Sequence, residues 1–332
     1  MKRVLYLLAV LAAATACGRP TGPSETGQDR FTILAPASAS VDLGLMFTEA
    51  GAAQWVQARS KLRGLQFYQQ SLRRSCPTCG GNNLERLVAS RPGGPFAWLS
   101  SQGIQIGVEA GAIKEHTCNG RELGRVALED VAPVYAAGSQ VTFIAMDEPF
   151  TAALPSTDTS PLAHCEFDIN RTVIEVKAFV DTVHERYPGI LIGLIEPYPY
   201  FTMENIITFI GALQNAGVRL PFFRIDFDLR HRRNTDANAS ADLKRLRSVL
   251  ADLGIEFELI VTGYDGKTDA GAVASAMALA YEVSGAVGRP QSVVFQDWSA
   301  DRLGGSSTAV NLPEGQVGSL TWLLNNGVEV FR

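Results

Sequence analysis

The chain has 332 residues, of which 46% are hydrophobic and 19% are charged, and this composition is typical of an ordered globular protein rather than a disordered one. The formal net charge of −5 and the lack of a basic stripe argue against a nucleic-acid-binding surface, which needs a concentrated excess of Lys and Arg. The length suits two ordinary domains or one large α/β barrel, and the order of the elements must decide between them.

Residues 1–16 have the layout of a signal peptide that is removed from the mature protein. Lys2 and Arg3 precede an apolar stretch, which runs into small residues and then into Cys17. The apolar run at 4–16 is too short to span a bilayer as a helix. The start of the chain therefore predicts export.

The sequence Ala-Thr-Ala-Cys at 14–17 resembles a bacterial lipobox, although Ala stands where Leu is usual. This resemblance implies that Cys17 becomes the lipidated first residue; cleavage near Ala16 beside an incidental cysteine is the alternative. Residues 17–30 are polar and rich in Gly, Pro, Ser and Thr, which predicts a flexible tether. We therefore expect a membrane-anchored lipoprotein of the cell envelope, on its periplasmic or extracellular face, with one folded domain at 31–332.

Export makes disulfide bonds the default expectation for the four remaining cysteines, which are Cys76, Cys79, Cys118 and Cys165. A zinc site is the alternative, because Cys76 and Cys79 have ligand spacing and His116 and His164 lie beside the other two cysteines. A redox-active Cys-x-x-Cys would open a helix of a thioredoxin-like unit, and no such context surrounds this pair. The sequence leaves the pairing open.

From residue 31 onward, short β-rich runs alternate with longer amphipathic segments. Eight runs are expected strands, at 31–35, 64–70, 104–109, 141–148, 190–196, 222–228, 257–263 and 292–298. Helices are predicted between them, as at 171–187, after Thr202, and after Asn238 or Ser240. Eight βα units in one domain of this length predict a (β/α)8 TIM barrel. A doubly wound open sheet is the alternative, but no Gly-rich nucleotide loop follows the first strand.

Alternation along the expected strands places polar side chains inside the barrel. In the sixth strand the apolar residues at 223, 225 and 227 must face the helices, so Arg224, Asp226 and Asp228 point inward. In the second and third strands the same alternation turns inward Gln66, Tyr68, Gln70, Gln105, Gly107 and Glu109. Because a structural interior would consist mainly of Val, Ile and Leu, we expect this one to be wet and acidic toward the C-terminal ends of the strands.

The active sites of TIM barrels form at those C-terminal ends. There the chain places the carboxylates of Glu109, Asp147, Glu148, Glu196, Asp226, Asp228 and Asp297. Like charges in a partly buried site raise one another's pKa. The cluster therefore fits acid/base chemistry or a bound cation.

The end of the fourth expected strand reads Phe-Ile-Ala-Met-Asp-Glu-Pro-Phe at 143–150. It resembles the corresponding strand end of TIM-barrel glycoside hydrolases, which implies that Glu148 donates a proton to the glycosidic oxygen. The next strand ends in Ile-Glu-Pro-Tyr-Pro-Tyr at 195–200, which repeats the Glu-Pro arrangement beside aromatic rings suited to stacking on sugars. The chain departs from retaining β-glycosidases at the end of strand seven, where their nucleophilic Glu is replaced by Val-Thr-Gly-Tyr-Asp. The second carboxylate is therefore sought in Glu196 or Asp226.

The leading hypothesis is a monomeric glycoside hydrolase that cleaves a poly- or oligosaccharide without a cofactor. Its expected catalytic residues are Glu148, Glu196 and Asp226. Its expected substrate-binding residues are Tyr68, Glu109, Asp147, Tyr198, Arg224, Asp228, Tyr264, Gln296 and Trp298. The competing interpretations are that Glu148 caps a helix or pairs with Arg224, that Asp226 only neutralises Arg224, and that Trp298 belongs to the core.

Two other classes of function stay open. A non-catalytic glycan-binding lipoprotein would hold a sugar with the same acidic and aromatic residues. A metal-dependent sugar isomerase or lyase would use Glu109, Glu148, Glu196 and Asp226 as ligands, but such barrels usually add a His at a strand end, and the four histidines here fall in loops or helices. A Ser-His-Asp hydrolase would need a nucleophile elbow such as Gly-x-Ser-x-Gly, which the sequence lacks.

Overall fold

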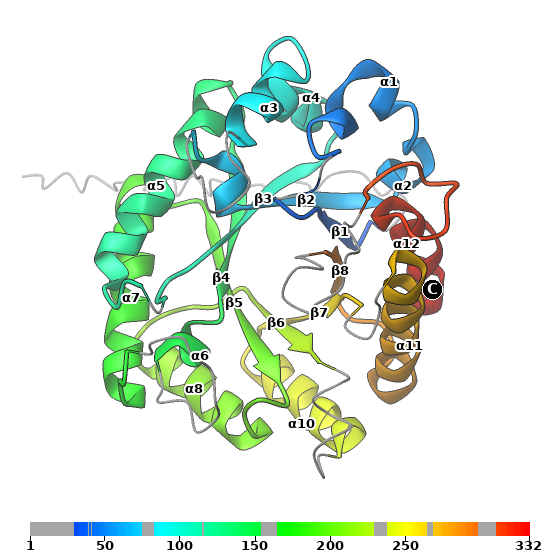
Figure 1. Cartoon of the computed structure of the whole chain (residues 1–332). Helices are drawn as coiled ribbons and strands as arrows, with labels where there is room; N and C mark the ends of the chain where they lie inside the picture. Colours follow the sequence, from blue (N-terminus) through cyan, green and yellow to red (C-terminus); the bar gives the residue numbers. More distant parts are fainter. Residues whose placement is uncertain are drawn as a thin grey trace, which may run out of the picture. The chain divides into compact units, whose positions relative to one another are not determined.

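The computed structural model describes residues 30–38, 40, 42–74, 83–114, 116–153, 165–228, 238–263, 268–297 and 310–332, and the part from Phe31 to Arg332 forms one compact unit. Eight parallel strands close into a barrel in the order β1 to β8, and helices surround it (Figure 1). This confirms the predicted (β/α)8 TIM barrel. The open, doubly wound sheet is excluded because β8 pairs with β1.

Each of the eight expected strands overlaps one strand of the barrel. The strands are β1 (Thr32–Ala35), β2 (Leu62–Tyr68), β3 (Gln105–Ala110), β4 (Val141–Asp147), β5 (Leu191–Tyr198), β6 (Phe222–Phe227), β7 (Glu256–Val261) and β8 (Ser292–Gln296). The helices are α1 (Glu49–Ala52), α2 (Val56–Ser60), α3 (Asn83–Ala89), α4 (Gly94–Ser101), α5 (Gly120–Ala136), α6 (Pro149–Ala153), α7 (Ile169–Arg186), α8 (Met203–Asn215), α10 (Ala239–Asp252), α11 (Asp269–Val287) and α12 (Leu320–Gly327). Short 3-10 turns are η1 (Leu45–Phe47), η2 (Gln69–Leu72) and η5 (Val328–Phe331).

Polar side chains start the helices where the sequence predicts it. The Thr202 side chain accepts a hydrogen bond from the backbone N–H of Asn205 at 3.2 Å and so caps α8. Asn238, rather than Ser240, caps α10, because its side chain accepts from the backbone N–H of Ala241 at 3.2 Å. These caps satisfy N–H groups that have no partner inside the helix.

Two apolar regions hold the barrel together. The larger one lies between the strands and the helices, and the smaller one lies inside the barrel and contains Ile33, Ala35, Phe143, Ala145, Ile195, Phe222, Ile260 and Val294. The rings of Phe143 and Phe222 lie over Gly107 and Gly193, where a Cβ atom would come within 2.0 Å and 2.2 Å of ring carbons. These glycines therefore make room for two aromatic rings inside the barrel.

The apolar composition of α11 has a structural explanation. Within the described residues it is the one helix long and apolar enough to cross a membrane by length and composition alone. Val273, Leu279 and Val283 on this helix belong to the buried core between strands and helices. The core of the barrel thus accounts for its apolar side.

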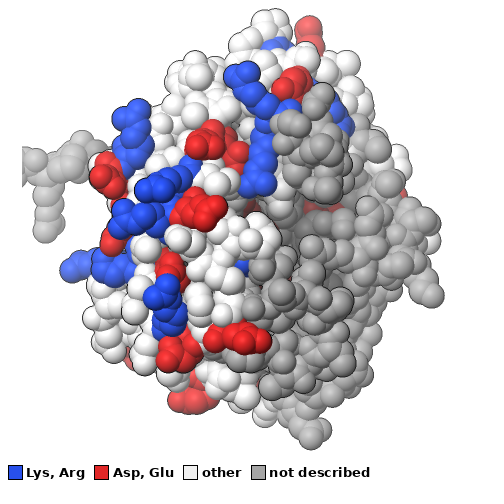
Figure 2. Space-filling view, turned by 60° about the vertical axis from the view of Figure 1, so that its left-hand side comes forward, with Lys and Arg blue, Asp and Glu red and all other residues white. Residues whose placement is uncertain are grey.

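The face that carries α5 and α7 displays acidic and basic side chains next to each other (Figure 2). On α7, Lys177 lies 2.7 Å from Asp181, and Arg171 lies 2.5 Å from Glu175, each pair one helical turn apart. Acidic and basic groups are therefore interspersed on this face, and at least Lys177 and Arg171 are paired.

Candidate active site

Polar side chains gather inside the barrel near the C-terminal ends of the strands. Tyr68 and Glu109 are register partners in β2 and β3, and Gln296 extends from β8 into the same region. All three are buried. Their inward orientation is the one that strand alternation predicts for Tyr68 and Glu109.

Glu109 lies at the centre of a buried hydrogen-bond network. Its Oε2 accepts from Nε2 of Gln66 at 2.7 Å and from Nε2 of Gln296 at 3.1 Å. Nε2 of Gln296 also donates to the Tyr68 hydroxyl at 2.8 Å, and that hydroxyl donates to the backbone oxygen of Asp297 at 3.2 Å. Side chains from β2, β3 and β8 are thereby fixed to one another.

Arg224 crosses the barrel and is buried completely, with 0% of its surface exposed. From β6 its Nη1 donates to Oε1 of Gln66 on β2, the strand opposite in the ring, at 2.5 Å. Its Nε and Nη2 donate to Oε2 of Glu258 at 2.9 Å and 2.7 Å. The guanidinium carbon lies 5.1 Å from the ring centroid of Phe222 and 5.8 Å from that of Phe143.

The described contacts of Arg224 are structural, and its predicted role in substrate binding stays a prediction. The side chain has no exposed surface, and its hydrogen bonds go to Glu258 and Gln66. Its ion pair is also with Glu258 rather than with Glu148 or Asp226. Arg224 is therefore a structural cation in the barrel interior.

Burial and neighbouring charges favour the protonated forms of Glu109 and Tyr68. Burial, followed by the charge of Asp147, raises the pKa of Glu109 well above its ordinary value, although Arg224 and Lys114 act in the opposite direction. Burial and then the charge of Glu109 raise the pKa of Tyr68 in the same way. Both groups can therefore serve as hydrogen-bond donors over a wide pH range.

Lys114 brings a positive charge to the end of β4. It lies in the loop after β3, and its Nζ is 2.5 Å from Oδ2 of Asp147. Both side chains are half-buried. Asp147, which the sequence assigned to substrate binding, is thus one half of an ion pair at the C-terminal end of the barrel.

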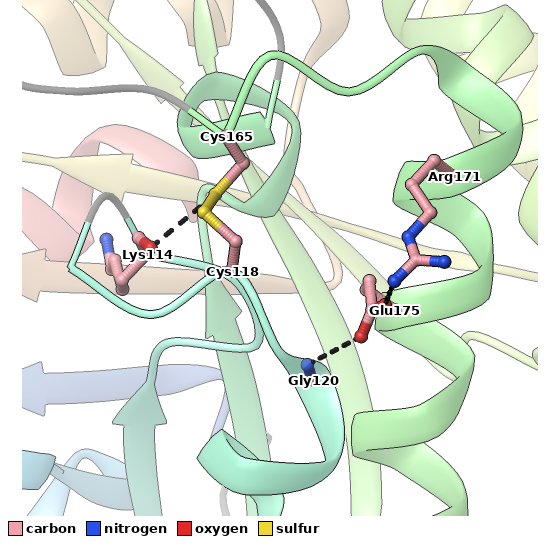
Figure 3. The surroundings of a disulfide bond; sticks show 6 residues. All are labelled: Lys114, Cys118, Gly120, Cys165, Arg171 and Glu175. Atoms are coloured by element: carbon pink, nitrogen blue, oxygen red, sulfur yellow. Dashed lines mark hydrogen bonds and ion pairs between the residues drawn. A yellow bond between two sulfur atoms is a disulfide. The ribbon is translucent and has the colours of Figure 1, made fainter.

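A disulfide bond fastens the loop that carries Lys114. Cys118 and Cys165 are bonded, with a Cα–Cα distance of 5.6 Å, and the backbone oxygen of Lys114 lies 3.7 Å from Sγ of Cys165 (Figure 3). Nearby, the backbone N–H of Gly120 at the start of α5 donates to Oε2 of Glu175 on α7 at 2.9 Å (Figure 3). This confirms a disulfide for Cys118 and Cys165, and it excludes these two sulfurs as zinc ligands.

Glu148 has an unusual backbone conformation at the junction of β4 and α6. Its φ of 47° lies in the left-handed region, which residues other than Gly, Asn and Asp rarely adopt. Its backbone oxygen accepts from the N–H of Ala152 at 3.1 Å, which is the first main-chain hydrogen bond of the short helix α6. Strain of this kind often occurs at functional sites, and its position at the C-terminal end of a barrel strand makes Glu148 a candidate site residue.

Glu196 faces the helices, and the expectation that it points into the barrel is wrong. Ile195 belongs to the inner apolar cluster, so alternation turns the next residue outward. Glu196 is 0% exposed, and its Oε1 accepts from the backbone N–H of Phe150 in the first turn of α6 at 2.8 Å. Thr151 Oγ1 lies 3.5 Å from the other oxygen.

The environment of Glu196 favours its neutral form. Burial raises its pKa well above the ordinary value, the hydrogen bond from Phe150 lowers it, and Glu148 and Asp147 raise it again. Glu196 therefore supports the junction that carries Glu148, and its predicted catalytic role stays a prediction.

Tyr198 also faces away from the barrel interior, whereas the sequence predicted a ring at the strand end that stacks on a sugar. It is buried, and its hydroxyl donates to Oδ2 of Asp242 on α10 at 2.6 Å. Its backbone oxygen accepts from the N–H of Asp228 at 2.9 Å. Asp228 is buried just after β6, while Asp226, two residues earlier, keeps the inward position that alternation predicts.

Several predicted residues lie outside the described residues, namely Cys17, Cys76, Cys79, Tyr264 and Trp298. Within the described residues, no group of three or more His, Cys, Asp or Glu side chains is arranged to hold a metal ion. The metal-dependent hypothesis therefore has no ligand set in that part of the chain.

Three residues that lie in or beside the site were not predicted from the sequence, namely Glu258, Gln66 and Lys114. Glu258 alternates with Phe257 and Leu259, so the pattern that identified Arg224 also identifies it. Gln66 was expected to point inward but was not assigned to the site. Lys114 lies in a loop, where no periodic signal indicates its direction.

No protein-family model and no curated protein sequence matches the chain. The Ignisphaera aggregans GH53 catalytic domain aligns over 80% of this chain and 84% of its own, at 10% identity and a TM-score of 0.54. GH5_18 from Streptomyces cattleya, in complex with GlcNAc, aligns over 91% of this chain and 80% of its own, at 10% identity and a TM-score of 0.53. A GH10 endoxylanase from a sugarcane soil metagenome aligns over 70% of this chain, which spans 66% of that protein, at 10% identity and a TM-score of 0.46.

These alignments concern the fold. The GH53 and GH5 structures share the closed barrel of this chain at low identity, so the resemblance to TIM-barrel glycoside hydrolases is confirmed as a resemblance of fold. A fold of this kind supports many chemistries, and the activity must be argued from the side chains.

Proposed function

We propose that the protein is a glycoside hydrolase that acts on a poly- or oligosaccharide at the C-terminal end of the barrel. The observation that carries this proposal is the strained backbone of Glu148, which follows Asp147 directly at the end of β4. The strand-four end is where the resemblance to TIM-barrel glycoside hydrolases assigns the proton donor. The GH53 and GH5 structures share the barrel that presents such a strand end, and the reaction itself is argued from the side chains.

In this proposal Glu148 protonates the glycosidic oxygen as the bond to the sugar breaks. Asp226 is the second carboxylate, because it remains inward-facing on β6 whereas Glu196 is committed to α6. Asp226 acts either as the nucleophile or as the base that activates water, and the separation of the two carboxyl groups sets the stereochemical outcome. Lys114 balances the charge of Asp147 beside them.

The proposal extends to the cell envelope. Export and lipidation at Cys17 would attach the chain to a membrane, and residues 17–30 would act as the tether that holds the barrel away from it. At the cell envelope, the substrate would be a polysaccharide or oligosaccharide that is accessible from the periplasmic or extracellular side of the membrane. Globomycin-sensitive processing, followed by mass spectrometry of the mature N-terminus, tests the anchor separately from the activity.

The activity is tested by reducing-end release from a panel of bacterial and plant polysaccharides, using the form that lacks residues 1–17. Glu148→Gln should lower the rate by about 10²- to 10⁴-fold, which is the usual contribution of a general acid. Glu185→Gln, which changes an exposed carboxylate on α7, is the matched control and should keep full activity. Release that survives EDTA argues against the metal-dependent alternative, and unchanged turnover by Glu148→Gln would refute the assignment.

A second variant separates the side chain from the backbone. Glu148→Gly removes the carboxyl group, and Gly adopts a φ of 47° without strain. The free energy of unfolding of Glu148→Gly should therefore exceed that of Glu148→Ala by about 1 kcal/mol. Both variants should lack activity. Saturable binding of a sugar without any turnover by the parent protein would favour the non-catalytic glycan-binding lipoprotein instead.

A further inference from the structure

The hydrogen bonds around Glu109 have a fixed direction. Arg224 has donors only, so Oε1 of Gln66 must accept from it, and Nε2 of Gln66 must therefore donate to Glu109. On the other side, the Tyr68 hydroxyl donates to a backbone oxygen, so its own oxygen accepts from Nε2 of Gln296. The same Nε2 donates to Glu109.

This direction determines which oxygen of Glu109 can carry a proton. Oε2 receives two N–H groups and must remain an acceptor. Oε1 has no hydrogen bond to any described residue, although Glu109 is only 7% exposed. A proton bound to this carboxyl group therefore sits on Oε1.

The charges that surround Glu109 favour that proton. The titratable and charged groups that act on it are Tyr68 on β2, Asp147 on β4, Arg224 and Asp226 on β6, and Lys114 in the loop after β3. Both cations are already engaged, Arg224 with Glu258 and Lys114 with Asp147. Burial and the two aspartates thus outweigh them, and the pKa of Glu109 is raised well above its ordinary value.

A second side chain indicates that this region meets a ligand. Gln296 is 5% exposed, and its Oε1 has no donor among the described residues. Buried polar atoms in native proteins are almost always paired, and an unpaired one at a candidate active site points to a group that arrives with the substrate or with water. This unpaired Oε1 belongs to the same Gln296 side chain whose Nε2 donates a hydrogen bond to Glu109.

We propose that Glu109 is a neutral carboxylic acid that donates its Oε1 proton in a hydrogen bond to an oxygen atom of an uncharged sugar. This rests on the proposed function, and it gives Glu109 a substrate-binding role separate from that of Glu148. No covalent bond forms or breaks in this step. The sugar is uncharged because Asp226 acts on the donor and would repel a uronate, while the one cation beside Asp147, Lys114, is already paired with that aspartate.

Glu109→Gln distinguishes a neutral donor from an ionised base. The amide oxygen of Gln can accept from Gln66 and Gln296 as Oε2 does, while its N–H₂ group takes the place of the Oε1 hydroxyl and donates permanently. Glu109→Ala removes the donor. Both are made in the Glu148→Gln background, which leaves bound oligosaccharides uncleaved.

Binding is measured by calorimetry with xylohexaose, cellohexaose, mannohexaose and chitohexaose, and with trigalacturonate as the anionic probe. For the uncharged sugar that binds, the affinity of the protein with Glu109 intact should fall about tenfold as the pH is raised through the range in which Glu109 ionises, because the donor is then lost. Glu109→Gln should keep its affinity across that range, and Glu109→Ala should bind about tenfold more weakly at every pH. No binding of any uncharged probe, tighter binding of trigalacturonate, or weak binding by Glu109→Gln would overturn the proposal.

Infrared spectroscopy reports the proton without any ligand. The difference between the spectrum of the parent protein and that of Glu109→Gln should contain the C=O band of a protonated carboxyl group at neutral pH. The absence of this band would overturn the proposal. Glu185→Gln, which changes an exposed carboxylate, should give no such band. If the parent protein cleaves a polysaccharide but shows no carboxylic C=O band, the neutral Glu109 is refuted and the hydrolase is not. If the band and the pH-dependent binding are observed but no substrate is cleaved, the hydrolase is refuted and the neutral Glu109 is not.

Discussion

Arg224 provides a sharp test of how the interior of this barrel is stabilised. The side chain donates twice to Glu258, once to Gln66, and lies over the rings of Phe143 and Phe222. Arg224→Met keeps much of the volume but leaves Glu258 as a buried carboxylate without this partner. Removing one member of a buried ion pair usually costs about 3 to 5 kcal/mol.

The lower end of that range applies here because a second cation stands near. Nη1 of Arg63 lies 3.8 Å from Oε1 of Glu258 and is partly exposed, so it offsets part of the lost interaction. We expect Arg224→Met to lower the free energy of unfolding by about 3 kcal/mol, and Glu258→Leu to have a similar effect. The double variant should be clearly more stable than the sum of the single losses predicts, because it leaves no unpaired buried charge; Oε1 of Gln66 still loses its donor, so a loss of about 1 to 2 kcal/mol remains.

Urea unfolding of all four proteins, followed by circular dichroism at neutral pH with the disulfide intact, measures these differences as shifts of the midpoint at constant slope. The coupling between Arg224 and Glu258 is then the departure of the double variant from the sum of the single ones. A loss below about 1 kcal/mol for Arg224→Met, or additive losses in the double variant, would refute the reasoning. Either result would mean that water or Arg63 satisfies Glu258 by itself.

Two further predictions concern the supports of the site. Replacing Cys118 and Cys165 by Ser removes a disulfide that joins residues 47 positions apart, and closing a loop of this length in the unfolded chain is worth about 4 kcal/mol. The free energy of unfolding, measured in urea, should therefore fall by about 2 to 4 kcal/mol, and a fall below about 1 kcal/mol would contradict this. Glu196→Gln keeps an oxygen that accepts from the N–H of Phe150 but removes the carboxyl group. Burial raises the pKa of Glu196 in the folded protein, so this group makes the parent less stable as the pH rises above about 4.5, and the variant lacks this effect. The variant should therefore gain relative to the parent between pH 4 and pH 8, and an equal difference at both pH values would argue against a buried, protonated Glu196.

Much of the fold follows from local patterns in the sequence. Each strand of the barrel was predictable because apolar runs separated by amphipathic helices require a parallel sheet, and a count of eight favours closure. Thr202 was predictable as a cap because its hydroxyl lies one turn before the first free N–H groups of α8. In β6 the alternation of Arg224 and Asp226 with phenylalanines identified the inward face.

The candidate site was only partly predictable, because alternation does not say by itself which of the two sets of side chains on a strand faces the barrel axis. Glu196 and Tyr198 belong to the outward set of β5, and only the position of Ile195 inside the barrel reveals this. Lys114 reaches Asp147 from a loop whose course depends on the disulfide between Cys118 and Cys165. Neither contact leaves a periodic trace in the sequence.

The sequence by itself determined the barrel, its inward acidic residues and the carboxylate pair at the end of β4, because these depend on periodicity and on neighbours along the chain. The tertiary structure alone decided which acids are neutral and which are paired. Arg224 meets Gln66 from the opposite side of the barrel, and Glu109 meets Gln296 across the seam where β8 closes on β1. Burial and charge act through space rather than along the chain, so the protonation of Glu109 depends on contacts that exist only after the barrel has closed.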